Sequence, residues 1–297
     1  MSPTTLIEPT RLRLIGRSVA IRGLEEEIDR AAGVDGHVLL TGDRGVGKQM
    51  VARLIHQRSG RASASVVTVN CTGLPDVLLE SELFGHVRGG FAGAYRDKPG
   101  LLELADQGTV FLDDVGEMST RIQAALLRFL ASGDTQRIGA DHSHVRVNVR
   151  LVTGTTRDLQ PQIAAGAFRE DLYARLQVIR LTLPPLRERT GDIPRLVNFF
   201  LQSYADVHHV TTCVVSSEAL EALVAYPWPG NVHELKEVVE RLALMAGDST
   251  IALDALPKGV IRAGASEPAV FAAVGAPRQT APYAASRAPA DSPPDFL

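Results

Sequence analysis

The chain has 297 residues, with 31 Lys and Arg against 34 Asp and Glu, so its formal net charge is −3. This length suits one large domain and one smaller domain, and a near-neutral charge excludes a strongly basic nucleic-acid-binding chain. The two cysteines, Cys71 and Cys213, cannot form a disulfide framework or a C-x-x-C metal site. No signal peptide and no apolar run of about 18 residues is visible, so we expect a cytoplasmic protein that does not enter membranes.

The first part of the chain predicts an α/β domain. Residues 1–12 are polar and are expected to form a loose tail, and from 13 to 186 strand-like and helix-like patterns alternate. The strand-like runs are 38–40, 66–69, 110–112, 145–152 and 178–181. Short apolar strands without polar alternation are typical of a parallel sheet covered by helices on both faces. We therefore expect a doubly wound α/β fold.

One helix in this domain is especially clear from its spacing. Apolar residues recur at i, i+3, i+4, i+7 and i+8 from Ile122 onwards. Ser119 or Thr120 can cap its start, and Gly133 can end it.

The second part of the chain reads as helices only. Residues 187–260 are expected to form a small all-helical lid domain, in which Asn231 and Glu234 fit a capping box. Residues 261–297 are rich in Ala, Pro, Gly and Ser, and this composition predicts a disordered tail. No helix-turn-helix pattern is visible in that tail, so we expect no DNA-binding domain in this chain.

A phosphate-binding loop follows the first strand-like run. The segment from 42 to 48 matches G-x-x-x-x-G-K between a strand and a helix, which is the context that makes this motif specific. Backbone N–H groups of such a loop surround the phosphates, and the lysine reaches the β- and γ-phosphates of ATP. The position after the lysine is a glutamine, where a magnesium-binding Ser or Thr is usual. The residues expected to bind ATP here are Gly42, Asp43, Arg44, Gly45, Val46, Gly47, Lys48 and Gln49.

An acidic pair ends the run 110–112. Asp113 is expected to hold Mg²⁺, and Asp114 stands where a base would polarise the attacking water. Acids that simply cap a helix or face solvent are the alternative, which is weak beside a phosphate-binding loop.

Several further motifs resemble those of one family, the bacterial enhancer-binding proteins, which are AAA+ activators of sigma-54 RNA polymerase. The resemblance covers about 14–255 and depends on motifs in the family's order. These motifs are 80–86 (ESELFGH), 168–173 (FREDLY), 184–189 (PPLRER) and 228–231 (WPGN).

The resemblance implies roles for individual residues. Asn70 matches an asparagine that restrains the catalytic acid, and Thr155 lies at the phosphate-sensing strand end. Arg169 and Arg175 match arginines that enter the neighbouring subunit's site, which implies a ring, expected to be a hexamer. Ordinary surface ion pairing is the alternative for these two arginines. The implied partner is the sigma-54 RNA polymerase holoenzyme, and the implied cofactors are ATP and Mg²⁺.

Four departures from the family's pattern, three single residues and one loop, fall on functional positions. Asp114 replaces a glutamate, Thr156 replaces an asparagine, and His233 replaces an arginine near the γ-phosphate. An exposed helix residue is as good an interpretation of His233 as a sensing role. The sigma-contacting loop, usually G-A-F-T-G-A, keeps an aromatic anchor but loses its threonine. In this chain it reads Gly89, Gly90, Phe91, Ala92, Gly93 and Ala94.

Two functional hypotheses follow from these features. The first is an ATPase that remodels the polymerase closed complex. The second is a nucleotide-binding regulator with little or no hydrolysis, which acts by binding other activator subunits. A P-loop enzyme for an unrelated small substrate is a poor third, because it leaves 80–94 unexplained.

Overall fold

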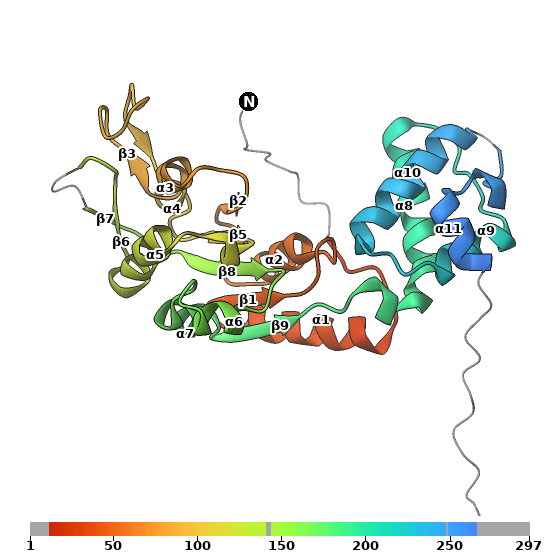
Figure 1. Ribbon diagram of the computed structural model, residues 1–297, viewed down its shortest axis with the longest axis horizontal. Coiled ribbons are helices and arrows are strands. Elements are labelled where there is room, and N and C mark those ends of the chain that lie inside the picture. Colours follow the sequence, from red (N-terminus) through yellow and green to blue (C-terminus); the bar gives the residue numbers. More distant parts are fainter. Residues whose placement is uncertain (1–11, 141–143, 248, 266–297) are drawn as a thin grey trace, which may run out of the picture. The chain divides into compact units, whose positions relative to one another are not determined.

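The computed structural model describes residues 12–140, 144–247 and 249–265 (Figure 1). Its first part interleaves nine strands with seven helices, numbered along the chain within this described range. The strands are β1 Val38–Thr41, β2 Val66–Asn70, β3 Gly85–His86, β4 Lys98–Pro99, β5 Thr109–Asp113, β6 Asp134–Gln136, β7 His144–Arg146, β8 Arg150–Thr155 and β9 Ile179–Thr182. The helices are α1 Val19–Ala32, α2 Lys48–Gln57, α3 Asp76–Phe84, α4 Leu101–Leu104, α5 Thr120–Ser132, α6 Leu159–Ala164 and α7 Glu170–Leu176.

The central sheet has the strand order β2-β5-β8-β1-β9, and every neighbouring pair in it is parallel. The register aligns Asn70 with Asp113 and Leu40 with Gly154. All five strands therefore end at one edge, where the chain turns out of the sheet. Ligands of open α/β sheets bind at this carboxyl edge.

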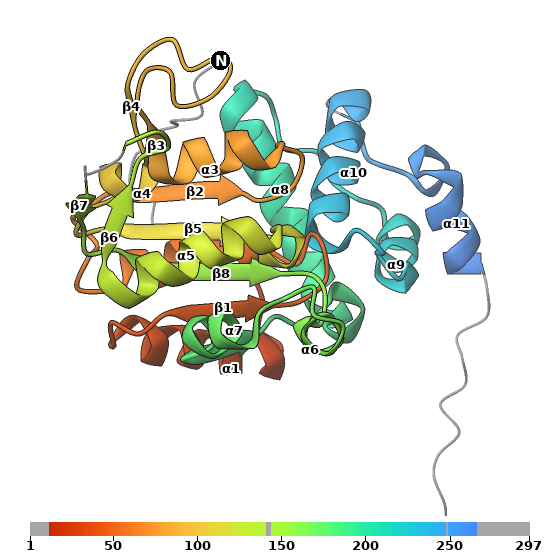
Figure 2. The same ribbon diagram turned by 60° about the vertical axis from the view of Figure 1, so that its left-hand side comes forward.

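Helices cover both faces of the sheet, as the apolar runs predict (Figures 1 and 2). On one face Leu40, Phe111 and Val152 are buried together with residues of α1 and α2. On the other face Leu39 and Leu112 join a larger core with α3, α5 and α7. Successive residues of one strand thus enter two different cores, because side chains alternate across a strand.

Helix α5 has the ends that its sequence predicts. The Ser119 side chain accepts a hydrogen bond from the Ile122 N–H, and Gly133 ends the helix in the left-handed conformation. Two short antiparallel hairpins lie beyond the main sheet, β3 with β4 and β6 with β7. The run 145–152, expected as one strand, contains the end of β7 and the start of β8, and residues 147–149 between them belong to neither strand.

The second part of the described chain is helical. It contains α8 Ile193–His208, α9 Ser217–Ala225, α10 Asn231–Ala246 and α11 Lys258–Ala265. Their buried apolar residues form a separate core around Trp228, which is fully buried and donates its indole N–H to the Leu223 carbonyl. Helix α11 runs past residue 260, so the expected boundary of the tail at 261 is too early. The rest of the expected tail and the first eleven residues lie outside the described residues.

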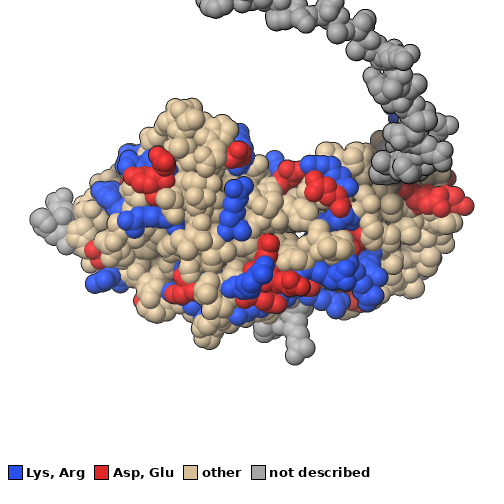
Figure 3. Space-filling view, turned by 90° about the horizontal axis from the view of Figure 1, so that it is seen from below, with Lys and Arg blue, Asp and Glu red and all other residues tan. Residues whose placement is uncertain are grey.

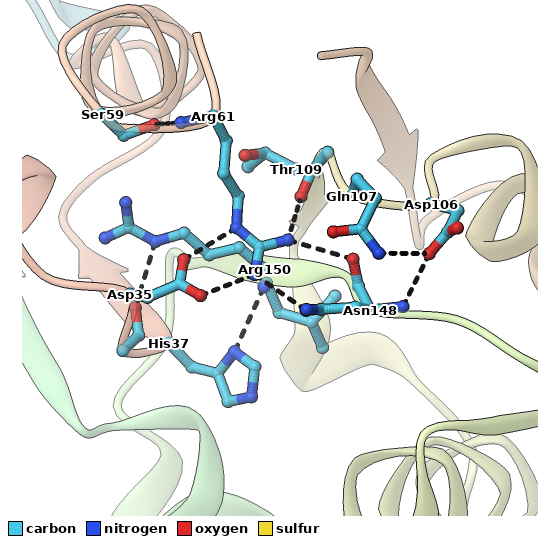
Figure 4. A network of polar contacts seen from close by, with 12 residues as sticks. Asp35, His37, Ser59, Arg61, Asp106, Gln107, Thr109, Asn148 and Arg150 are labelled. Carbon is cyan, nitrogen blue, oxygen red and sulfur yellow. Dashed lines mark hydrogen bonds and ion pairs between the residues drawn. The ribbon is translucent and has the colours of Figure 1, made fainter. Parts of the chain in front are cut away.

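A polar network closes the amino ends of the strands, opposite the carboxyl edge (Figure 4). The Arg61 guanidinium binds both carboxylate oxygens of Asp35 and the side-chain oxygen of Asn148. Arg150 is only 1% exposed and donates to the carbonyls of Gly36 and Ala31, at the carboxyl end of α1. A cation at the carboxyl end of a helix is favourable. We therefore interpret this network as one that stabilises the fold.

The mixed charges on the surface and the absence of a disulfide between the two cysteines are what the composition predicts. On the face that Figure 3 shows, basic and acidic side chains are interspersed. Cys71 and Cys213 are both buried and unpaired. Among the described residues, no helix is long and apolar enough to cross a membrane.

Candidate nucleotide site and its surroundings

The loop between β1 and α2 has the shape of a phosphate cradle. Gly45 and Gly47 have φ values of 78° and 109°, which favour glycine, and Gly47 immediately precedes α2. A side chain at Gly45 would collide with the Gly230 carbonyl oxygen. The amino end of α2 therefore opens onto the loop, as the sequence predicts for a phosphate site.

Lys48 is 6% exposed and lies inside this loop. Its Nζ donates to the carbonyl oxygens of Gly42 at 3.0 Å and Asp43 at 3.2 Å. Burial lowers the pKa of Lys48, while the negative charges of Asp113, Asp114 and Asp43 oppose that change. Backbone carbonyls hold the buried ammonium group of Lys48 in this structure. A bound anion would pair with this charge and so offset the cost of burying it.

Asp113 ends β5 next to the lysine. Burial raises the pKa of Asp113, the Asp114 charge adds to this effect, and Lys48 opposes it. A Cβ at Gly154 on neighbouring β8 would lie 2.7 Å from Asp113 Oδ1, so glycine at 154 makes room for this carboxylate. Sequence reasoning missed Gly154, since its importance depends on a neighbouring strand.

These acids fit a hard divalent cation. Mg²⁺ prefers oxygen ligands and usually takes one or two carboxylates together with phosphate oxygens. Asp113 and Asp114 offer adjacent carboxylates of like charge that a cation would neutralise, and Gln49 is exposed one residue beyond Lys48. Among the described residues, no group of three or more His, Cys, Asp or Glu side chains is placed to hold a metal, so these two carboxylates would need phosphate oxygens and water as further ligands.

Asp114 has a contact that the sequence did not predict. Its backbone is left-handed, with φ 54° and ψ 50°, and the Thr156 hydroxyl donates to its Oδ1 at 3.1 Å. Asn70, expected to restrain this acid, instead accepts the Thr72 N–H and hydroxyl at its own Oδ1. The Thr155 hydroxyl likewise engages the backbone of Arg157.

The helical domain contacts the phosphate-binding loop through Asn231. This residue is fully buried with φ 54°, and its side chain accepts the Leu186 N–H and donates to the Arg44 carbonyl. The N-cap of α10 is Gly230, whose N–H is bound by Glu234. The expected capping box is therefore not formed, because the Asn231 amide is used for a tertiary contact and Gly230 has no side chain; only the contact from Glu234 back to the N-cap N–H is present.

His233 faces solvent rather than the phosphate loop. Its side chain is 69% exposed, and Nε2 lies 3.1 Å from Glu237 one turn along α10. Its backbone N–H donates to the Gly45 carbonyl of the loop. Here the His233 side chain is that of an exposed helix residue, and its role in sensing nucleotide stays a prediction.

Two arginines of the motif 184–189 also serve the loop, which sequence reasoning did not foresee. Arg187 forms an ion pair of 2.7 Å with Asp43, and the buried Arg189 donates to the Val46 carbonyl at 3.5 Å. The motif 184–189, with its two prolines, marks both arginines in the sequence. It does not indicate that they contact the phosphate-binding loop.

Comparisons with known proteins agree with this geometry. The model of the "Sigma-54 interaction domain" matches residues 14–182, and that of the "AAA+ ATPase lid domain" matches residues 187–272. The chain belongs to the sigma-54 interaction domain family. It is an AAA+ protein with a parallel sheet between helices and a helical lid.

Individual relatives are similar over most of this chain. The anaerobic nitric oxide reductase transcription regulator NorR of Aeromonas salmonicida is 46% identical over 83% of this chain and 48% of its own length. The Nif-specific regulatory protein of Azotobacter vinelandii is 45% identical over 81% of this chain and 46% of its own. The chain thus spans about half the length of these curated relatives.

A solved structure is similar to this sigma-54 interaction domain throughout. NtrX from Brucella abortus in complex with ATP is 36% identical, with a TM-score of 0.79 over 84% of this chain and 55% of that one. The same protein in complex with ADP has a TM-score of 0.78 over the same shares of both chains.

The arginines expected to act on a neighbouring subunit are exposed in this domain. The Arg169 guanidinium binds both oxygens of Asp171, and Arg175 donates to the Leu130 carbonyl. The hydrogen bonds that the Arg169 guanidinium donates to the Asp171 carboxylate raise the pKa of Arg169. Both side chains now bind their own subunit, so an approach to a neighbour's nucleotide requires them to leave these partners.

The loop 89–94, expected to contact sigma-54, lies between β3 and β4 and is folded onto itself. The Gly89 N–H binds the Ala94 carbonyl, and Ala94 is buried. Phe91, expected as an exposed anchor, is half-buried with its ring edge-on to His86 at 5.1 Å. Tyr95 is instead the exposed aromatic residue here, at 87%.

Gly90 is enclosed rather than free. A Cβ at Gly90 would lie 2.5 Å from the Ile138 carbonyl oxygen, in the turn that follows β6. The neighbouring segment therefore limits the backbone freedom that a glycine at position 90 would otherwise have.

Proposed function

We propose that this chain is the ATPase module of a sigma-54 transcription regulator, which binds ATP with Mg²⁺ and hydrolyses it to remodel the closed complex of RNA polymerase. The observation that carries the proposal is the buried Lys48 beside Asp113 at the carboxyl edge of the sheet. The family membership and the ATP complex of a similar structure support it. A cytoplasmic location goes with this function.

Each residue of the site has a role in this proposal. N–H groups of the loop 42–48 and Lys48 bind the phosphates, and Asp113 with Asp114 holds the metal and the attacking water. Bound Mg²⁺ would neutralise charge on the phosphate oxygens. Arg169 and Arg175 complete the site of a neighbour in a ring, proposed to be a hexamer, and Thr155 lies beside the phosphates.

The partner-contacting residues are those of the folded loop 89–94. Its apolar surface and the exposed Tyr95 support contact with the sigma-54 holoenzyme. The second candidate, a nucleotide-binding regulator with little hydrolysis, is favoured by the orientation of His233, whose side chain pairs with Glu237 instead of facing the loop.

ATP turnover across a protein concentration series, with Mg²⁺, tests the proposal. We expect turnover per subunit to rise with concentration, since an arginine supplied by a neighbour typically contributes about 10³–10⁵ in rate. Lys48→Ala should abolish nucleotide binding, and Arg169→Ala should keep binding but lose turnover. ATP binding with turnover at background throughout the series would support the second candidate instead.

A further inference from the structure

A second cavity lies at the amino ends of the strands, at the opposite edge of the sheet from the phosphate-binding loop. It has a volume of about 310 Å³ and lies between the end of α1 and the turn that follows α2. Ala32 and Val34 contribute apolar surface to its wall. Four polar residues also line it, Asp35, Ser59, Arg61 and Arg150.

Three of these four polar residues already have partners. Arg61 binds both carboxylate oxygens of Asp35, at 2.7 and 2.6 Å, and donates its other N–H groups to oxygens of Gly108 and Asn148 (Figure 4). The Ser59 hydroxyl donates to the carbonyl three residues before it and accepts the Arg61 N–H. The charge of Asp35 is therefore balanced by that of Arg61.

Arg150 is the polar residue of this cavity whose side chain is not fully paired. Its Nε donates to the Gly36 carbonyl at 3.1 Å and its Nη2 to the Ala31 carbonyl at 2.7 Å. Its Nη1 is buried and has no hydrogen-bond partner among the described residues. A buried donor without an acceptor is costly, and so is a buried cation without a counterion. The cavity therefore ends at a group that an anion would satisfy.

The charge of Arg150 also acts on its titratable neighbours. Burial lowers the pKa of Arg150 itself, the Asp35 charge opposes this change, and the Arg61 charge adds to it. The pKa values of His37 and His56 are lowered chiefly by burial, and also by the positive charge of Arg150. This edge of the sheet thus carries one positive charge in excess of the Arg61–Asp35 pair.

We propose that this cavity binds a small monocarboxylate, whose carboxylate accepts hydrogen bonds from Arg150 Nη1 and whose aliphatic part lies against Ala32 and Val34. One negative charge matches the single positive charge that Asp35 leaves unbalanced. A planar guanidinium is well suited to a carboxylate, which can accept two of its N–H groups. The site is separate from the nucleotide site, so the proposal does not depend on ATP hydrolysis.

Butyrate, titrated into the full chain, tests the site. We expect a saturable shift of the backbone amide resonances of residues 33–36 and 59–61. Butyramide has nearly the same shape but no charge, and it should bind at least about tenfold more weakly, because it loses a charge-assisted hydrogen bond. Absence of a saturable shift, or equal affinity for butyramide, would overturn the proposal. Lys48→Ala should bind butyrate as the unaltered protein does, and a loss there would place the anion at the phosphate-binding loop instead.

Gly60 offers a matched pair of variants that leaves Arg150 in place. It lines the same cavity, its φ lies outside the left-handed region, and a Cβ there would meet no atom within 4 Å. Gly60→Asp adds a carboxylate to the cavity and should weaken butyrate binding by about tenfold or more. Gly60→Asn adds a side chain of the same size without charge and should leave the affinity nearly unchanged. Equal affinities in the two variants would overturn the role of charge.

Two further measurements place the carboxylate at Arg150. Arg150→Gln should lose butyrate binding, and the Gly60 variants decide the matter if this variant does not fold. Saturating butyrate should also raise the pKa of His37, followed by its ring resonances, because the anion offsets the charge of Arg150. A His37 pKa that stays in place, or butyrate binding that survives in a folded Arg150→Gln, would overturn the assignment.

Discussion

Asn231 is a single buried amide that joins three segments distant in sequence. It accepts the Leu186 N–H at 2.8 Å, donates to the Arg44 carbonyl at 2.9 Å and begins α10. The phosphate-binding loop, the segment that leaves the sheet and the first turn of the lid therefore share one side chain. Any change at this residue affects both folding and the loop.

We predict that Asn231→Ala destabilises the protein by roughly 2–4 kcal/mol, because two buried backbone groups lose their partners. Urea unfolding of both proteins measures this difference. Alanine also strains a backbone with φ 54°. Asn231→Gly removes that strain but not the loss of the amide, so a glycine variant as stable as the unaltered protein would contradict the role of the hydrogen bonds.

The same residue shows which parts of the site a sequence can predict. The loop 42–48 and Asp113 follow from local spacing, because a strand, a turn and a helix place them together. Asn231 resembles a helix cap, and its partner Arg44 is 187 positions away. The contact of Thr156 with Asp114 likewise depends on strand order, and no pattern within one segment encodes it.

At the scale of elements, the loop 89–94 is held against the turn that follows β6. The Val87 N–H binds the Ile138 carbonyl, and Gly139, with φ 79°, lies against Gly90. Two loops that are separate in sequence thus form one packed unit. Its glycines are required by close approach rather than by freedom of motion.

Gly90→Ala, which restores the family's usual residue, should therefore disturb this unit. The added Cβ would lie 2.5 Å from the Ile138 carbonyl oxygen, so one of the two loops must shift. We expect faster amide hydrogen exchange in residues 87–97 and 136–140 than in the unaltered protein. Ala92→Thr, at an exposed position of the same loop, is the control and should leave exchange unchanged. Equal exchange rates in Gly90→Ala and Ala92→Thr would contradict this prediction, because they would show that the loops accommodate the added Cβ without being destabilised.

The sequence predicts most elements, since short apolar runs and capped helical periods are local properties. It fails at 145–152, where apolar character does not indicate a strand throughout. Val147 and Val149 are buried, but they lie in the connection between β7 and β8. Burial there comes from packing against α5 and its neighbours in the core.

At the scale of the whole molecule, two histidines link folding to pH. His37 and His56 both have pKa values lowered chiefly by burial, and the charge of Arg150 adds to this effect. The His37 ring accepts the Leu151 N–H at Nδ1, and the His56 ring shares a hydrogen bond with Thr109. Both rings are therefore neutral in the native protein at pH 7.

We predict that the free energy of unfolding falls as pH is lowered from 7 toward 5. Unfolded histidine binds a proton near pH 6.5, whereas the native rings bind one only at lower pH, so acid favours the unfolded chain in this window. His37→Asn offers an acceptor near the position of Nδ1 but does not titrate. Urea unfolding at several pH values should give a shallower pH dependence for this variant than for the unaltered protein. His144 is exposed, so His144→Asn is the matched control. If the free energy of unfolding of His37→Asn depends on pH as strongly as that of the unaltered protein, His37 does not couple folding to pH.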